Sequence, residues 1–286
     1  MNKKRFILNA GNFGASKDAN RAIIEGYAEG LLKSASLIAN GEAFDDAVEN
    51  VIPRCTDLGV GIHLNLSEGY SLCSDLELLT DANGKFNNSY FQLLIKSYNP
   101  KEIEFFQQVE REFRRQIEKV LAKTQVSHIG SFSHIHSIPR IFEMVCRLAK
   151  EYGIKYVQTQ FEKLYIIPDL HIHMCKNYLL NLLKLLMLDT FTVLNEATIH
   201  RWGLKTNDYT VGIIYDSIME ALALSYGISA VNYNNITVEA VIYPCRYEDG
   251  TVNNNFTQYL ITRNKKLKEK IKDLGFEITN YAEKEN

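Results

Sequence analysis

The side chains best suited to chemistry in this sequence are histidines that follow strand-like runs. His63 lies in an apolar stretch, residues 58–66, whose alternation puts His63 and Asn65 on one face of a strand. His134 and His136 follow a second such run, which begins at residue 126. Imidazole rings suit zinc or nickel better than magnesium, so these positions indicate a metal or ligand site.

A third group of histidines is less convincing. His171 and His173 lie close to Cys175, but no second ligand group stands at a supporting spacing. We therefore interpret this segment as a surface or interface loop. Trp202 could stack on a sugar ring, although a single aromatic residue after a helix is more often part of the core.

The first strand carries the most informative positions. Residues 5–9 form an apolar strand, Gly11 and Asn12 follow it, and a helix is expected over residues 18–33 with Ser16 as its N-cap. In α/β proteins, ligands bind at the carboxyl end of such a strand. Neither Gly11 nor Asn12 can act as a carboxylate.

Strands alternate with helices along the whole chain. We expect strands at residues 5–9, 34–39, 58–66, 126–138, 154–159, 237–243 and 275–280, and helices at 18–33, 43–52, 100–123, 139–152, 179–194, 216–226 and 264–274. This order predicts an α/β fold with parallel strands, closed or nearly closed into a barrel. Because no internal repeat or linker is visible, we expect a single domain over residues 1–286.

Composition and charge restrict the class of ligand. Apolar residues make up 46% of the chain, and 32 basic residues against 34 acidic ones give a net charge of −2. A nucleic-acid partner usually needs a basic face, so we expect no nucleic-acid binding. A small neutral ligand such as a sugar is compatible with this composition.

The cysteines and the apolar segments allow predictions of the cellular compartment and of the oligomeric state. The five cysteines are widely spaced and the basic N-terminus is followed by too short an apolar run for a signal peptide, which favours a reduced, cytoplasmic protein. The apolar residues 179–194 are fewer than the roughly 20 that a membrane span needs, so we expect no membrane insertion. They form either a buried helix or a homodimer contact.

Three motifs occur together in a recognisable order. N-A-x-x-F-G lies at residues 9–14, G-x-H-L-N-L at 61–66, and H-x-x-S-x-x-H-x-H at 128–136. With these motifs the chain resembles the YdjC/ChbG (ChbG/HpnK-like) family of carbohydrate deacetylases. The resemblance implies a distorted TIM-like (β/α) barrel. It also implies hydrolytic N-deacetylation of N-acetylated sugars, with a divalent metal (Mg or Zn) activating a water while a carboxylate takes its proton.

The chain departs from the family pattern where the chemistry is expected. The family's N-A-D-D-F-G turn supplies a base and a metal ligand, and here Gly11 stands at the base position and Asn12 at the ligand position. His63 keeps the family's strand ligand, whereas Phe132 stands where the third ligand, a histidine, is expected, and Gly130 stands where the family has an aspartate. An amide such as Asn12 can coordinate a cation but cannot accept a proton from water.

These departures leave two interpretations. In the first, the family mechanism is lost, metal binding is weak or absent, and a sugar pocket remains, lined by Asn65, Glu68, His134, His136 and Tyr243, the last at a family histidine position. In the second, a metal site is rebuilt around His63, His134 and His136, since the last two share a face with Phe132 if residues 126–138 are a strand. A third possibility is that the barrel catalyses a different reaction, in which case the residues responsible would lie in the long loop region at residues 67–100.

Overall fold

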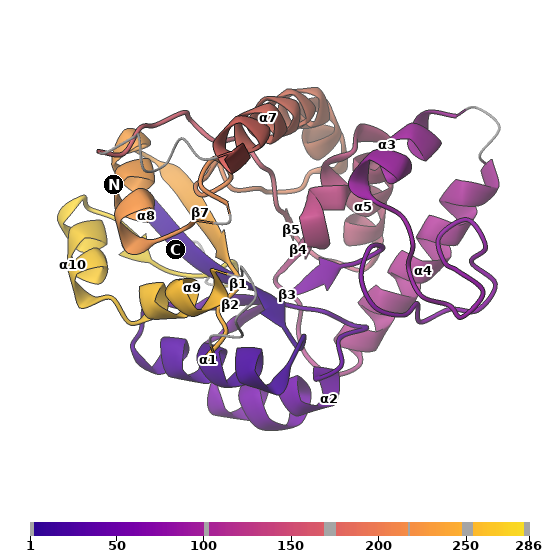
Figure 1. Cartoon of the computed structure of the whole chain (residues 1–286), viewed down its shortest axis with the longest axis horizontal. Helices are drawn as coiled ribbons and strands as arrows, with labels where there is room; N and C mark the ends of the chain where they lie inside the picture. Colours follow the sequence, from indigo (N-terminus) through magenta and orange to yellow (C-terminus); the bar gives the residue numbers. More distant parts are fainter. Residues whose placement is uncertain (1–2, 100–102, 169–175, 217, 248–253, 283–286) are drawn as a thin grey trace.

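The computed structural model describes the whole chain except short stretches, namely residues 1–2, 100–102, 169–175, 217, 248–253 and 283–286 (Figure 1). His171, His173 and Cys175 therefore lie outside the described residues. A parallel sheet forms the centre of the molecule. Its strands are β1 (Lys4–Phe13), β2 (Ser34–Leu37), β3 (Gly59–Leu64), β4 (His128–Ser131), β5 (Tyr156–Val157), β6 (Tyr209–Thr210), β7 (Ile236–Ile242) and β8 (Glu277–Ile278).

The sheet is curled, and its two edges approach each other. From edge to edge the order is β5-β4-β3-β2-β1-β7-β6, and β8 pairs with the start of β1. Backbone hydrogen bonds join each edge strand to the chain near the other edge. The Val157 amide of β5 donates to Lys205 O at 3.0 Å, and the Thr210 amide of β6 donates to Phe161 O at 2.8 Å. The expected α/β, TIM-like fold is thus confirmed, with a distorted, nearly closed sheet.

Helices surround this sheet (Figure 1). They are α1 (Lys17–Ala28), α2 (Phe44–Asp46), α3 (Tyr90–Tyr98), α4 (Ile103–Leu121), α5 (Pro139–Glu151), α7 (Lys176–Trp202), α8 (Ala221–Ala230), α9 (Asn255–Thr262) and α10 (Lys265–Asp273). A π-helical stretch, Ala47–Val51, extends α2, and short 3₁₀ helices occupy Ile52–Arg54 and Phe132–Ser137. The Ser16 N-cap is confirmed, since its hydroxyl accepts from the Ala19 amide.

Alternation along the strands divides the side chains between two faces. Phe6 and Leu8 of β1 and Ile62 of β3 belong to the main hydrophobic core, which the helices cover. In α4 the core-facing residues recur at helical spacing, as Phe105, Val109, Phe113 and Ile117. The other face of the sheet lines the interior of the curled sheet and is much more polar.

β1 is longer than the sequence predicts. It continues through Gly11 and Asn12 to Phe13, instead of ending at residue 9, because β7 pairs with it as far as Ala10 and β2 as far as Phe13. The pairing with β2 shifts register between Ala10 and Phe13. Gly11 and Asn12 are therefore part of an irregular strand end and not of a free turn.

The prediction of a strand over residues 126–138 is wrong beyond Ser131. After β4 the chain turns into the 3₁₀ helix Phe132–Ser137, in which Ser133 (φ 51°) and His134 (φ 58°) have left-handed backbones. The sequence also gave no sign of α3, α9 or the short β6, and it placed α8 several residues too early.

The apolar helix is longer than residues 179–194. α7 has 27 residues, and its segment from Tyr178 to Trp202 is long and apolar enough to cross a membrane by those two criteria. The expectation that the segment is too short was therefore wrong. Only 17% of its apolar window is buried, and the other residues are partly or largely exposed.

Candidate functional site

His63 occupies a buried, mostly aromatic position near the carboxyl end of β3. Its side chain is 2% exposed. The rings of Phe132 and Tyr243 each meet the imidazole edge-on, with centroids 6.3 Å away. Burial lowers the pKa of His63 to about 3, and nearby His136 contributes to this shift. At neutral pH the ring is therefore uncharged, with one N–H donor and one acceptor nitrogen.

Neither nitrogen of His63 has a hydrogen-bond partner within the described part of the chain. The same is true of Asn12 Oδ1, although Asn12 Nδ2 donates to Pro244 O at 2.9 Å. Buried polar atoms without partners are uncommon in folded proteins. These atoms mark the carboxyl end of β1 and β3 as a place where a ligand or water would find hydrogen bonds.

Tyr243 fills the space beside Gly11. A Cβ placed on Gly11 would lie 2.8 Å from Cε1 of the Tyr243 ring and 3.1 Å from Cγ1 of Val241. Tyr243 itself follows β7, and its amide donates to Gln258 Oε1 of α9 at 2.6 Å. An aspartate at position 11 would therefore require this tyrosine to move.

Gln158 fills the space beside Gly130 in the same way. A Cβ on Gly130 would overlap Gln158 Oε1, while Gln158 Nε2 donates to Glu239 Oε1. Burial raises the pKa of Glu239 to about 8. Sequence reasoning missed Gln158 and Glu239, and the available signal was a charged residue inside the apolar β7 run.

His136 is held in place by residues of β4 and by the chain that follows β5. Its Nδ1 is 2.5 Å from Ser131 Oγ, and its Nε2 is 2.9 Å from Gln158 O. Its ring also stacks near Phe142 of α5, with centroids 6.4 Å apart. Both nitrogens are occupied, so His136 is a buried structural histidine in this arrangement.

His134 does not share a strand face with His136, because both residues belong to the 3₁₀ helix. The premise of a rebuilt site on one strand face, with Phe132, His134 and His136 aligned, is therefore wrong. The left-handed backbone at Ser133 and His134 rotates the successive side chains away from strand alternation.

Asn65 and Glu68 form a turn after β3. Asn65 Oδ1 accepts from the Ser67 and Glu68 amides, at 2.9 and 3.0 Å, and Asn65 Nδ2 donates to Glu68 O at 2.7 Å. Gln116 of α4 bonds the backbone of Asn65 on both sides. All polar atoms of the Asn65 side chain serve this turn, whereas the Glu68 side chain is exposed.

Trp202 is also part of the protein scaffold. Its indole Nε1 donates to Glu143 Oε1 at 2.9 Å, which ties the end of α7 to α5. The ring packs against the main core and is only partly buried. This arrangement matches the interpretation of Trp202 as a packing residue.

The donor set around His63 does not fit a catalytic metal centre. Among the described residues, no group of three or more His, Cys, Asp or Glu side chains is arranged to hold a metal ion. Two aromatic rings flank His63, Asn12 offers only a neutral amide, and both nitrogens of neighbouring His136 already have partners. Zinc and magnesium sites need more ligands and, for magnesium, anionic oxygen.

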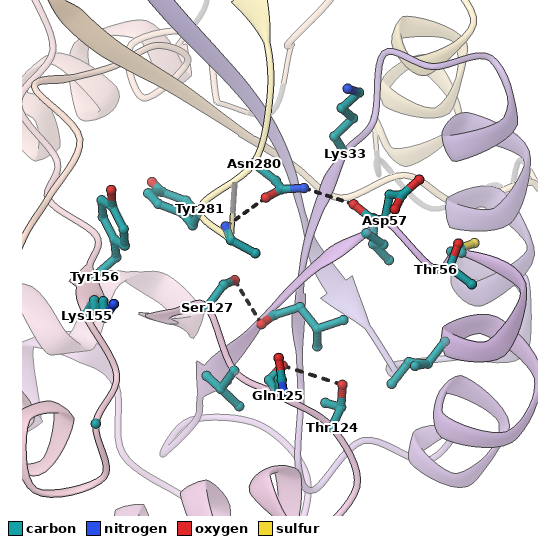
Figure 2. Close-up of a pocket in the computed structure, with 17 residues that line it drawn as sticks. Lys33, Thr56, Asp57, Thr124, Gln125, Ser127, Lys155, Tyr156, Asn280 and Tyr281 are labelled. Atoms are coloured by element: carbon teal, nitrogen blue, oxygen red, sulfur yellow. Dashed lines mark hydrogen bonds between the residues drawn. The ribbon is translucent and has the colours of Figure 1, made fainter. Parts of the chain in front are cut away.

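A cavity of about 770 Å³ lies at the opposite end of the sheet (Figure 2). Its lining includes residues that immediately precede strands, among them Lys33, Leu58 and Ser127. Ser127 Oγ donates to Val60 O and Asn280 Nδ2 donates to Asp57 O, both at 2.9 Å. The amino-terminal face of a barrel usually contributes to stability, whereas His63 lies at the carboxyl end of the strands.

Comparison with known proteins now decides the family. A family model described as YdjC-like protein matches residues 5–272, nearly the whole chain. This chain belongs to the YdjC-like family. The resemblance inferred from the three sequence motifs is thereby confirmed.

Curated relatives of this YdjC-like protein carry the name carbohydrate deacetylase. The protein from Brevibacillus brevis is 39% identical over 151 residues, which cover 52% of this chain and 57% of that relative. Carbohydrate deacetylase 1 from Listeria innocua is 42% identical over 152 residues, covering 52% of this chain and 59% of the relative. The matches thus span less than two thirds of these relatives.

Solved structures share the fold of this YdjC-like chain at low identity. A protein described as a putative cellobiose-phosphate cleavage protein from Enterococcus faecalis superposes with a TM-score of 0.73 at 17% identity, covering 98% of each chain. An uncharacterized protein from Agrobacterium tumefaciens gives a TM-score of 0.53 at 10% identity, covering 98% of this chain and 88% of the other. These similarities concern the fold.

Proposed function

We propose that this YdjC-like protein binds a sugar and does not carry out the carbohydrate deacetylation for which its relatives are named. The observation that carries the proposal is the surroundings of His63, where Phe132 and Tyr243 take the place of ligand side chains. Gly11 supplies no base, and Tyr243 occupies the volume beside it. Without a carboxylate, a metal-bound water has no group to accept its proton.

The same surroundings suit a sugar. The neutral ring of His63 offers one donor and one acceptor, and Asn12 Oδ1 offers an acceptor, all three unpartnered within the described residues. A sugar hydroxyl both donates and accepts hydrogen bonds. Phe132 and Tyr243 supply aromatic surface against which the apolar face of a sugar ring packs.

The alternative function, a deacetylase with a rebuilt site, is weaker on this geometry. It needs His134 and His136 to join His63 at one ion, yet both nitrogens of His136 already contact Ser131 and Gln158. Displacing them would break two buried hydrogen bonds, each worth about 0.5–1.5 kcal/mol.

An assay of acetate release tests the absence of catalysis. The protein is incubated with N-acetylglucosamine and its disaccharide, with magnesium or zinc added, and acetate is measured against a heat-killed control. We expect no acetate above that control. Acetate release that is lost in His63→Phe would overturn the proposal and favour the rebuilt enzyme.

Binding is tested by calorimetry with the same sugars. We expect the affinity to fall about tenfold or more in Asn12→Ala and in His63→Phe, which keeps the ring volume but removes both nitrogens. His200→Ala changes an exposed histidine on α7 and is the matched control. Equal affinity of all variants, with their thermal stability unchanged, would remove His63 and Asn12 from the binding site.

A further inference from the structure

A pair of opposite charges, Lys184 and Asp216, lies at the same end of the sheet as His63. Lys184 Nζ of α7 is 2.7 Å from Asp216 Oδ2, and the two side chains are 30% and 46% exposed. An ion pair this accessible to solvent usually contributes little to stability. Both charges therefore remain within reach of a ligand.

The sheet topology places Asp216 at this end. β6 pairs in parallel with β7, its Thr210 opposite Glu239. The Val211 amide then donates to Glu239 O at 2.8 Å, and the chain continues past the carboxyl end of β6 to Asp216. Since β7 leads in the same direction to Tyr243, Asp216 and Tyr243 follow two neighbouring strands at one edge of the sheet.

Hydrogen bonds from other parts of the chain hold the segment that ends at Asp216. Asn181 Nδ2 of α7 donates to Ile214 O at 3.2 Å and to Asp216 O at 2.9 Å. The Glu162 side chain accepts from the Ile214 amide at 2.9 Å. Because Asn181 and Lys184 lie about one turn apart on the same helix, α7 fixes both the backbone and the side chain of Asp216.

The charges of this pair act on the side chains around His63. Burial raises the pKa of the Tyr243 hydroxyl, and the negative charge of Asp216 adds to that shift. Burial lowers the pKa of His134 well below its ordinary value of 6.5, and the positive charge of Lys184 is the next largest cause. Because the ring of Tyr243 meets His63 edge-on, the pair lies at the margin of the proposed sugar site.

We propose that Lys184 and Asp216 make the sugar site selective for uncharged sugars. This selectivity rests on the proposed sugar-binding function, which it makes more specific. A carboxylate accepts hydrogen bonds and an ammonium group donates them, so the pair can hold two neighbouring hydroxyl groups of one sugar ring. Hydrogen bonds to ionised groups are about twice as strong as those between neutral groups.

The same pair discriminates against charged sugars. A sugar ammonium group is attracted by Asp216 but repelled by Lys184, and a sugar phosphate experiences the reverse. A charged ligand therefore gains little unless it separates two ions that are 2.7 Å apart. A sugar hydroxyl can contact each ion while the pair stays closed, and the uncharged ring of His63 adds no charge to the site.

Calorimetry with three sugars tests the selectivity of the wild type. N-acetylglucosamine is uncharged, glucosamine at slightly acidic pH carries an ammonium group, and N-acetylglucosamine 6-phosphate carries an anion. We expect the uncharged sugar to bind about tenfold more tightly than either charged sugar, or better.

Removing one charge of the pair should change this preference. In Lys184→Met the remaining carboxylate attracts a cation, so the affinity for glucosamine should rise about tenfold relative to that for N-acetylglucosamine. In Asp216→Asn the remaining ammonium group attracts an anion, so the relative affinity for the 6-phosphate should rise by a similar factor. A merely structural role of the pair would not produce these two opposite shifts.

Arg201→Met is the matched control. Arg201 pairs with Glu143 at 3.1 Å and is also exposed, but it lies near the carboxyl end of α7. Removing this cation should leave all three affinities at their wild-type values. Lys184→Arg keeps the charge of the pair and should keep the wild-type preference. Thermal denaturation of each variant shows whether it is folded under the conditions of the titration.

The results that overturn the proposal are distinguishable from a failure of sugar binding itself. If the wild type binds N-acetylglucosamine and both Lys184→Met and Asp216→Asn keep its preference, the pair does not select the sugar, although sugar binding stands. A wild-type preference for either charged sugar has the same meaning. If the wild type binds none of the three sugars, the proposed function fails and the selectivity fails with it.

Discussion

At the carboxyl end of the sheet, two glycines that depart from the family motifs are each matched by a large side chain that follows a neighbouring strand. Gly11 leaves room for Tyr243, and Gly130 leaves room for Gln158. In each pair, the small residue on one strand and the large residue near another fill one volume. Restoring an aspartate at either glycine would therefore create a steric conflict before it created a metal site.

The first prediction concerns Gly130→Ala. Because the added Cβ overlaps Gln158 Oε1, we expect the free energy of unfolding to fall by about 1–3 kcal/mol, measured by urea denaturation. In a Gln158→Ala background the same substitution should cost at least about 0.5 kcal/mol less. Equal costs in the two backgrounds would show that Gln158 does not occupy this space.

At the scale of elements, the 3₁₀ helix Phe132–Ser137 determines what the third motif can do. In a strand, His134 and His136 would align with Phe132, as the sequence suggested. The left-handed backbone at Ser133 and His134 instead breaks the strand alternation, and Ser131 and Gln158 contact both ring nitrogens of His136. The conformation of one short turn thus removes the strand alignment on which a rebuilt metal site was predicted.

The second prediction follows from the backbone of Ser133. A left-handed conformation costs a non-glycine residue about 1–2 kcal/mol, and glycine avoids most of this cost. We expect Ser133→Gly, at an exposed position with φ 51°, to raise the free energy of unfolding by about 0.5–1 kcal/mol.

The matched control is Ser229→Gly. Ser229 is exposed within α8, where glycine should lower the free energy of unfolding by about 0.5–1 kcal/mol. Both variants are measured in the same urea titration. If the two substitutions changed stability in the same direction, the left-handed conformation of Ser133 would be in doubt.

The molecule as a whole encloses titratable groups whose charge states are set by burial. Burial lowers the pKa values of His63 and His128 to about 3, and it raises those of Glu162 and Glu239 to about 8. All four side chains are neutral in the folded protein at pH 7. The unfolded chain instead ionises its glutamates above their ordinary pKa of 4.5 and protonates its histidines below 6.5.

The third prediction is a loss of stability from pH 6.5 to pH 8. In this range the unfolded state has ionised Glu162 and Glu239, while the folded state still holds their protons, so raising the pH favours unfolding. Each glutamate contributes up to about 1.4 kcal/mol per pH unit. The buried histidines oppose part of this loss near pH 6.5, because the unfolded chain still holds about half of their protons there while the folded chain holds none; this opposing contribution vanishes as the pH approaches 8.

Urea denaturation of Glu239→Gln at pH 6.5 and pH 8 measures how much Glu239 contributes to the pH-dependent loss of unfolding free energy. We expect the loss of unfolding free energy between the two pH values to be smaller than that of the wild type, by up to about 1.4 kcal/mol per pH unit. Glu77→Gln, at an exposed position, should retain the full loss. A wild-type chain whose stability is flat over this range would contradict the neutral state of these buried acids.

The sequence by itself determined the family and most of the framework. The three motifs lie at strand ends because local apolar alternation fixes strands β1, β3 and β4, and Ser16 marks its helix through a local N-cap. The absence of carboxylates at Gly11 and Asn12 is likewise a property of the sequence. Such features depend on neighbours a few residues away, so local pattern is enough to find them.

Only the tertiary structure decided what surrounds those positions. Gln158 comes to lie beside Gly130 because β5 pairs with β4, and Tyr243 beside Gly11 because β7 pairs with β1. His136 contacts Ser131 and Gln158 because a 3₁₀ turn, which no hydrophobic period signals, replaces the strand. The exposure of α7 was equally hidden, since an apolar helix has the same sequence whether the barrel or a second chain covers it.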